Sequence, residues 1–270
     1  MRVPFVKMHG LGNDFIVLDA REGGVPPVDA ALAAALADRH RGIGCDQLVL
    51  IEPSDVADLK MRIFNQDGSE VEACGNATRA VGLLHGAPAR IETLAGIIHA
   101  APEAEGISVD MGRPRFDWDT IPLAYAMDTL TMPLGWEELD APTAVNVGNP
   151  HVIFFVPDTH VLPLDVLGPV IEHDPVFPAR INVNVATVTA RDAITLRVWE
   201  RGAGLTLACG TGACATAIGA MRRGLVDRRV TVTLPGGALV IEWRQDGGIT
   251  MTGPASESFR GSFELSAFTA

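Results

Sequence analysis

The stretch LKMRIFNQDGSEVEACG, residues 59–75, has a counterpart in ITLRVWERGAGLTLACG, residues 194–210. The two stretches align at a fixed offset of 135 residues, which places Cys74 on Cys209. In both copies the shared Ala-Cys-Gly is followed by a run of small residues. Self-similarity at one spacing is typical of a duplicated architecture, so we expect two related halves.

A shorter echo precedes each copy and supports the duplication. Gly-Asn-Asp at 12–14 corresponds to Gly-Asn-Pro at 148–150, at an offset of 136. The chain has 270 residues, a length that accommodates two domains of ordinary size. We expect a first domain of residues 1–117 plus 262–270 that contains Cys74, and a second of residues 118–261 that contains Cys209.

Each copy predicts the same order of elements. Residues 61–64 and 195–199 are apolar or β-branched and predict strands. Turn-rich residues follow, and the small residues after each Cys-Gly predict helices over 76–84 and 211–222.

The rest of the chain gives further expectations. An Ala- and Leu-rich run predicts a helix over 29–40, and strands are expected at 152–156, 181–189 and 230–234. Residues 111–142 contain several Pro and Asp and predict a linker between the halves.

Charge and hydropathy exclude several classes of partner. The chain has 21 basic and 33 acidic residues, a net charge of −12, which disfavours nucleic acid. No apolar run approaches the roughly 18 residues that a membrane span needs. The first residues lack the apolar core of a signal peptide, so we expect a cytoplasmic protein. We expect its partner to be a small-molecule substrate.

The composition also disfavours a cofactor. Lys7 and Lys60 are the only lysines, and neither lies in a setting that suggests a Schiff base with pyridoxal phosphate (PLP). The cysteines form no Cys-x2-Cys pair, so zinc is disfavoured. We therefore expect neither a cofactor nor a metal.

The two Cys-Gly steps carry the chemistry. A helix N-terminus has unpaired N–H groups and a partial positive charge, which lower a thiol pKa and can bind a carboxylate. Two such thiols related by pseudo-symmetry, Cys74 and Cys209, can face one carbon from opposite sides. One thiolate then removes a proton while the opposing thiol delivers one, which inverts a stereocentre.

A single cysteine in a helix of small residues is more often a buried core residue. We apply that interpretation to Cys45 and Cys214. The matched Cys-Gly context of Cys74 and Cys209 favours the catalytic interpretation for those two.

The sequence resembles the diaminopimelate epimerases, a family of cofactor-independent two-cysteine epimerases. The resemblance covers most of the chain in the order of the family. The segments that carry it are KMHGLGNDFIVLD (7–19), RGIGCDQLVLIE (41–52), FNQDGSEVEACGNATR (64–79), VNVGNPHVIF (145–154), RINVNVATV (180–188) and WERGAGLTLACGTGACA (199–215).

The resemblance implies a fold and an activity. The fold is α/β of the α+β type: two pseudo-symmetric domains, each a mostly antiparallel or mixed sheet wrapped around a central helix, with the active site in the cleft between them. The activity is interconversion of LL- and meso-diaminopimelate in lysine and peptidoglycan precursor synthesis, and a homodimer is implied.

The resemblance also implies roles for particular residues. Cys74 and Cys209 are the acid/base pair, and His151 and Glu200 tune the pKa values of the thiols. The positions that match substrate-binding residues are Asn13, Gln47, Asn65, Gly75, Asn76, Asn149, Asn182, Glu200, Arg201, Gly210 and Thr211.

Other interpretations of these residues stay open at this stage. Taken singly, Asn13 and Asn149 suit turns, His151 suits a core, and Glu200–Arg201 suits an exposed ion pair. The chain could also be a proline or hydroxyproline racemase of the same fold, a non-catalytic amino-acid-binding protein, or a redox sensor that links its two cysteines.

Overall fold

The computed structural model describes residues 1–72 and 74–268. The chain forms two compact units. Unit 1 contains Met1–Val109 and the described chain from Thr252 onward, and unit 2 is Asp110–Met251. The boundaries expected from the sequence, after residues 117 and 261, lie further along the chain. Residues 269 and 270 of the expected C-terminal return lie outside the described residues.

Unit 1 is a mixed sheet with two helices. Its strands are β1 (Arg2–Gly10), β2 (Asn13–Asp19), β3 (Gln47–Glu52), β4 (Leu59–Asn65), β5 (Glu70–Val71), β6 (Ala89–Thr93), β7 (Gly96–Glu103), β8 (Gly106–Asp110) and β19 (Ser256–Glu264). Its helices are α1 (Ala30–Ala37), α2 (Gly75–His85) and a short 3-10 turn at Leu265–Ala267.

Unit 2 repeats this plan with an extra hairpin. Its strands are β9 (Gly135–Trp136), β10 (Leu139–Asp140), β11 (Thr143–Asn146), β12 (Pro150–Phe155), β13 (Asn182–Ala190), β14 (Ala193–Glu200), β15 (Gly204–Thr206), β16 (Arg229–Leu234), β17 (Gly237–Trp243) and β18 (Ile249–Gly253). Its helices are α3 (Leu164–Glu172), α4 (Gly210–Arg222) and a 3-10 turn at Thr159–Val161.

The strand pairing confirms the duplication. In unit 1, β2 pairs parallel with β3, β3 antiparallel with β4, and β4 antiparallel with β5 and parallel with β6. In unit 2, β12, β13, β14, β15 and β16 repeat these pairings in the same order and sense. Ile63 pairs with Val71 and Val198 with Thr206, which is again an offset of 135. The mixed α+β class expected from the sequence is confirmed.

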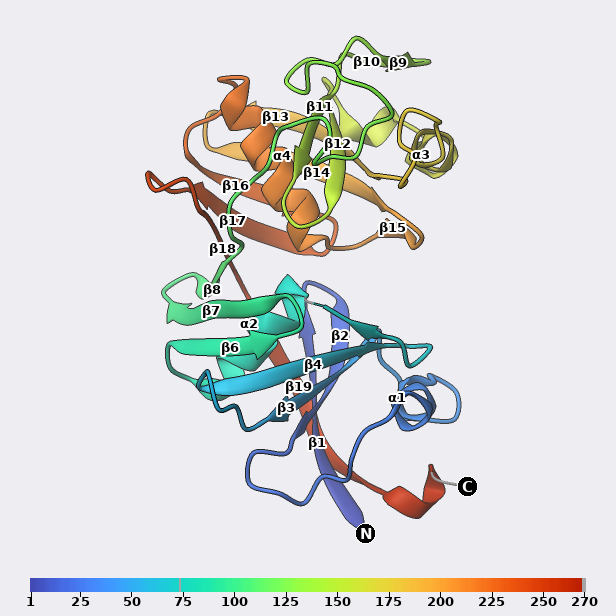
Figure 1. The fold of residues 1–270 in the computed structure, drawn as a ribbon, viewed down its shortest axis with the longest axis vertical. Coiled ribbons are helices and arrows are strands. Elements are labelled where there is room, and N and C mark those ends of the chain that lie inside the picture. The colour runs from blue at the N-terminus through green and yellow to red at the C-terminus, as the bar shows by residue number, and fades with distance from the viewer. Residues whose placement is uncertain (73, 269–270) are drawn as a thin grey trace. The chain divides into compact units, whose positions relative to one another are not determined.

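Each unit is built around one helix that begins at a cysteine. Helix α2 contacts β1, β7 and β19, and α4 contacts β11–β14, β16 and β17 (Figure 1). Both helices were predicted to within one residue at each end. Their small residues allow this close approach: a Cβ added to Gly82 would come within 2.8 Å of Ile107 Cγ2.

Two further helices cover the sheets away from the central helices. Helix α1 contacts β3 and β4, and α3 contacts β13, β14 and β15. Helix α1 is shorter than the predicted 29–40, because Asp29 caps its N-terminus by accepting from Leu32 N–H, and Asp38 leaves the helical conformation. Helix α3 was not predicted.

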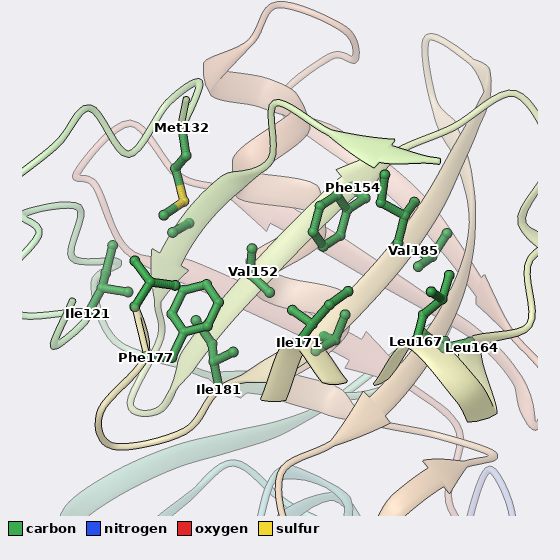
Figure 2. Close-up of a cluster of buried hydrophobic side chains, with 14 of the residues drawn as sticks. Ile121, Met132, Val152, Phe154, Leu164, Leu167, Ile171, Phe177, Ile181 and Val185 are labelled. Atoms are coloured by element: carbon green, nitrogen blue, oxygen red, sulfur yellow. The ribbon is translucent and has the colours of Figure 1, made fainter. Parts of the chain in front are cut away.

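The apolar core of unit 2 corrects one prediction. Residues 111–142 were expected to be a linker, but Ile121, Met132 and Leu139 are buried against Phe154 and Phe177 in one cluster (Figure 2). The linker prediction is therefore wrong for this segment. Its apolar residues are spaced irregularly, so they enter the core from non-repetitive backbone that has no periodic signature.

In unit 1, both ends of the chain pack on the same core. Strand β1 pairs antiparallel with β19, with Val3 opposite Phe263. Phe263 contacts the ring of Phe268 edge-on, and both belong to the cluster that buries Leu36 of α1. Among the described residues, no helix combines the length and apolar character needed to cross a membrane.

Two glycines of unit 1 allow a matched test of packing. Gly68 (φ +82°) and Gly86 (φ +74°) both have left-handed backbone. A Cβ at Gly68 would overlap the backbone oxygen of Ala30, whereas a Cβ at Gly86 meets nothing within 4 Å. We expect Gly86→Ala to cost about 1 kcal/mol of unfolding free energy and Gly68→Ala about 3 kcal/mol or more. Equal losses in denaturant titrations would contradict the packing argument.

Candidate active site

Cys74 is the N-cap of α2. Its backbone is extended (φ −148°, ψ 115°), and its carbonyl accepts from both the N–H and the hydroxyl of Thr78 at 2.9 Å. The helix begins at Gly75, so the N–H groups of Gly75 and Asn76 belong to the first turn, where an α-helix offers no internal acceptors. Local structure therefore presents a thiol and donors at one point.

The amide of Asn13 lies next to the Cys74 thiol. Sγ lies 3.9 Å from Oδ1 of Asn13, and the Nδ2 group of Asn76 donates to the same Oδ1 at 3.1 Å. Buried Arg79, one turn further along α2, donates to Asn76 Oδ1 at 2.8 Å. This series of donors and acceptors fixes the amide of Asn13 with its oxygen toward the thiol.

An ion-pair cluster holds Asn13 from the other side. Nδ2 of Asn13 donates to Asp46, and Asp14 and Asp46 each accept the other's backbone N–H. Burial alone would raise the pKa of the Asp14 carboxyl, but hydrogen bonds from Arg39 and Lys7 outweigh it and lower the pKa to about 2. These hydrogen bonds join the start of β2 to the residue that precedes β3, beside the Cys74 thiol.

Gln47 and Asn65 lie opposite each other on β3 and β4. Nε2 of Gln47 donates to Asn65 Oδ1, and Nδ2 of Asn65 donates to Ser69, both at 3.1 Å. The Oε1 atom of Gln47 is buried and has no hydrogen-bond partner among the described residues. An unsatisfied buried acceptor of this kind suits an ammonium group.

Cys209 is the N-cap of α4 and is only 4% exposed. Its Sγ accepts the N–H of Gly212 at 3.3 Å and lies 3.6 Å from the hydroxyl of Thr211. As in unit 1, the helix start supplies further N–H groups, here from Gly210 and Thr211.

The electrostatics of Cys209 overturn one prediction. The helix N-terminus was expected to lower the thiol pKa, but burial raises the pKa of Cys209 well above its usual value. The negative charge of Glu200 raises it further, and the hydrogen bonds from Thr211 and Gly212 only partly offset both effects. Removal of water destabilises the Cys209 thiolate by more than the donors at the helix start stabilise it.

His151 lies between two amides in unit 2. Nδ2 of Asn184 is 3.0 Å from its Nδ1, and Oδ1 of Asn149 is 2.9 Å from its Nε2. The ring is fully buried, and this burial lowers its pKa to about 3, with a further contribution from the charge of Arg201. His151 is therefore a neutral imidazole at physiological pH.

The end of β14 carries Glu200 and Arg201. Asn182 accepts the backbone N–H of Arg201 at 2.9 Å and donates to the Pro150 carbonyl at 2.8 Å. The exposed Arg201 guanidinium donates to the Ala179 carbonyl at 3.0 Å. Asn182 is thus a support for this turn.

Glu172, at the end of α3, stabilises the same turn through hydrogen bonds. It is 2% exposed, and its two oxygens accept from Trp199 Nε1 at 2.7 Å and from Gly202 N–H at 3.0 Å. No local pattern indicates this role, because an acidic residue at a helix end usually lies in solvent.

The structure therefore joins the predicted residues into several local groups. In unit 1, Asn13, Cys74 and Asn76 form one group, and Gln47 and Asn65 another. In unit 2, Cys209 groups with Thr211 and with the charge of Glu200. The other two groups of unit 2 are Asn149 with His151 and Asn182 with Arg201.

Sequence reasoning missed the residues that hold these groups. They are Asp14, Asp46, Arg79, Glu172 and Asn184. Several of them stand inside the segments that carry the family resemblance, but nothing in their local sequence indicates a polar role in a buried network.

Two pseudo-symmetric α+β units, each with a cysteine at the start of its central helix, define the class: this is an amino-acid epimerase, an isomerase that needs no PLP. The chain belongs to the diaminopimelate epimerase family, which matches residues 5–116 and 143–257. It is 69% identical over 264 residues to the diaminopimelate epimerase of Erythrobacter litoralis, with 98% of each chain covered.

Two further similarities concern the family and the fold, respectively. The diaminopimelate epimerase of Rhizorhabdus wittichii is 65% identical over 270 residues, which cover 100% of this chain and 98% of the relative. The crystal structure of a Bacillus anthracis phenazine biosynthesis protein of the PhzF family has the same fold. It aligns with a TM-score of 0.71 at 17% identity, with 98% of this chain and 100% of that chain covered.

The burial of His151 predicts a specific loss of stability in acid. In the unfolded chain a histidine binds a proton below about pH 6.5, whereas His151 in the folded chain resists protonation down to about pH 3. Between these values the unfolded state binds more protons, so the unfolding free energy decreases as pH falls, by up to about 1.4 kcal/mol per pH unit from this group.

The check is to measure unfolding free energies of wild type and His151→Gln from pH 7 to pH 4. We expect the difference between the two proteins to shift in favour of the variant as pH falls. A difference that is constant with pH would contradict the assignment of a buried neutral ring.

Proposed function

We propose that the chain interconverts LL-2,6-diaminopimelate and meso-2,6-diaminopimelate with a thiolate and a thiol as the two bases. The observation that carries the proposal is the repeated placement of a cysteine as N-cap of the central helix, at Cys74 and at Cys209. The names of relatives up to 69% identical supply the substrate.

The proposed reaction is a pair of proton transfers. The thiolate of one cysteine takes the Cα proton, forming an S–H bond, and the electron pair of the broken C–H bond delocalises into the substrate carboxylate. The thiol of the other cysteine then protonates Cα from the opposite face, breaking its own S–H bond. Cys74 and Cys209 exchange roles with the direction of reaction, which requires that both reach the same carbon.

The helix starts are suited to the charge that develops on the carboxylate. The first-turn N–H groups of Gly75, Asn76, Gly210 and Thr211 have no acceptors within their own helices. Donors fixed in place before reaction stabilise a developing oxyanion without reorganisation.

The raised pKa of Cys209 supports its role as a base. The α-proton of an amino acid is weakly acidic, so the base that removes it should be strong. Burial and the charge of Glu200 make the thiolate of Cys209 more basic than an ordinary one. His151 is neutral, so it adds no positive charge that would lower the pKa of Cys209.

The distal end of the substrate carries an ammonium and a carboxylate. The guanidinium of Arg201 suits the carboxylate, and Glu200 suits an ammonium. The amide groups that would complete the site are Asn13, Gln47, Asn65, Asn149 and Asn182, each held by the hydrogen bonds described above.

The wider setting of the reaction is proposed from family membership alone. We place it in lysine and peptidoglycan precursor synthesis in the cytoplasm, without a cofactor, and take the acting form to be a homodimer. A proline or hydroxyproline racemase, an amino-acid-binding protein and a redox sensor are the alternatives, and the following experiments separate them.

Incubation with LL-diaminopimelate in deuterated water tests the two-thiol reaction. We expect deuterium at the inverted carbon with no added cofactor, and a loss of kcat of at least about 10³-fold in Cys74→Ser and in Cys209→Ser. Cys45→Ala is the matched control: it removes a core thiol whose pKa burial raises to about 11, and it should retain turnover. Turnover that survives loss of either Cys74 or Cys209 would overturn the two-thiol mechanism. Absence of exchange in the wild type would instead favour a binding protein or a redox sensor.

Replacement of Arg201 tests the substrate. We expect Arg201→Gln to raise KM for diaminopimelate at least tenfold. A change of this size corresponds roughly to the free energy of one charge-assisted hydrogen bond. Arg191→Gln, which breaks an exposed ion pair with Asp227, should leave KM unchanged. Proline turnover that equals diaminopimelate turnover, or a KM insensitive to Arg201, would favour the cyclic imino acids.

A further inference from the structure

Asn184, the residue that contacts His151, is a fully buried amide in unit 2. It lies on β13, two residues after Asn182, and pairs with Ile153 of β12. Its Nδ2 group is 3.0 Å from Nδ1 of His151. Its Oδ1 has no hydrogen-bond partner among the described residues. A buried amide that is only half satisfied is costly, so a compensating role is expected.

The hydrogen bonds around His151 are directional. A neutral imidazole has one donor and one acceptor nitrogen. Nδ2 of Asn184 can only donate, so Nδ1 is the acceptor and Nε2 carries the proton. Nε2–H then donates to Oδ1 of Asn149 at 2.9 Å, which leaves the Nδ2–H groups of Asn149 for other partners.

Burial disfavours the charged form of the ring, which would remove this directionality, by more than the hydrogen bond with Asn184 favours it. His151 is completely buried between β11 and β13, and Arg201 is the charged group whose field acts on it. A positive neighbour and the absence of water both disfavour a second proton on the ring.

The duplication shows that the pair is particular to unit 2. Phe15 pairs with Gln47 in unit 1 as His151 pairs with Asn182 in unit 2. By the same correspondence Val49 stands where Asn184 stands. Unit 1 is apolar at both positions, and there the equivalent of Asn149, Asn13, turns its oxygen to the thiol instead.

We infer that Asn184 is a positioning residue: it fixes the Nε2–H tautomer of His151 and, through that ring, the orientation in which Asn149 presents N–H donors to a substrate carboxylate. The inference rests on the proposed function for its substrate, but the tautomer itself does not depend on it.

The position of Asn184 also brings it to the start of α4. A Cβ added to Gly212 would lie 3.2 Å from Asn184 Oδ1 and 3.2 Å from Cys209 Sγ. The amide therefore lies beside the glycine whose N–H binds the thiol, and rotation of the amide would exchange an acceptor for a donor at this point. Holding Nδ2 on His151 keeps the oxygen at the helix start.

The ring nitrogens can be observed directly by NMR in enzyme labelled with 15N-histidine. In the wild type at pH 7 we expect His151 to show an unprotonated Nδ1 and a protonated Nε2. The opposite tautomer, or an imidazolium, would overturn the inference without any variant and without any activity measurement.

Asn184→Asp reverses the direction of the hydrogen bond. In its ionised form the new carboxyl has no proton to donate, so Nδ1 takes the proton, and in the neutral ring Nε2 can then accept from Asn149 after its amide rotates. Because burial favours a neutral carboxyl, whose O–H could still donate to Nδ1, the variant is examined at a pH where the 13C resonance of the carboxyl shows that it is ionised. We expect a protonated Nδ1 in the variant and a loss of kcat/KM for diaminopimelate of about tenfold to a hundredfold.

Asn146→Asp is the matched control, since Asn146 is also buried in unit 2 and donates to a backbone carbonyl, that of Thr120. It introduces a carboxyl group at a buried position of unit 2, where Arg115 already donates to Asn146 Oδ1 at 3.1 Å, and should leave the His151 resonances as in the wild type.

The outcomes separate this inference from the proposed function. An unprotonated Nδ1 beside the ionised carboxyl of Asn184→Asp, or unchanged kcat/KM despite a switched tautomer, would overturn the positioning role. A wild type with the expected tautomer that fails to epimerise diaminopimelate would refute the proposed function and leave the tautomer assignment standing.

Discussion

The structure depends on two enclosed helices whose first residues stay partly accessible. Helices α2 and α4 each begin at a cysteine in extended conformation, and most of each helix is enclosed by strands of its own unit. An α-helix leaves its first N–H groups without internal acceptors. Gly75, Gly210 and Thr211 are half-buried, so their N–H groups can bind an acceptor, and Cys209 Sγ accepts the N–H of Gly212. Small residues along both helices permit this enclosure. The composition of each helix is therefore linked to the chemistry at its start.

Burial also decides the protonation of the groups around the helix start of unit 2. The helix start and two hydrogen bonds favour the thiolate of Cys209, yet removal of water and the charge of Glu200 oppose it more strongly. The same removal of water keeps His151 neutral. For the reaction proposed above, a basic thiolate suits removal of a weakly acidic proton better than a thiol that ionises easily, because a stronger base makes the proton transfer from carbon less unfavourable.

The two units share a framework but not a polar network. The five strands of each unit that surround the repeat, β2–β6 and β12–β16, pair in the same order and sense. Unit 1 orients its amide at Asn13 through Asn76, Arg79 and an ion-pair cluster, whereas unit 2 orients Asn149 through His151 and Asn184. Duplication therefore preserved the backbone pairing, while the side chains that hold the equivalent amides differ between the units.

The sequence by itself determined the duplication, the two central helices and the cysteines at their starts. These features are local: a repeat at an offset of 135 and runs of small residues can be read without knowing what packs where. Only the tertiary structure decided that residues 121–139 enter a core, that Glu172 supports the turn after β14, and that Asn184 meets His151 across two strands. It also reversed the expected direction of the Cys209 pKa. Burial and hydrogen bonding between residues distant in sequence depend on which segments meet, and the local pattern of the chain does not contain that information.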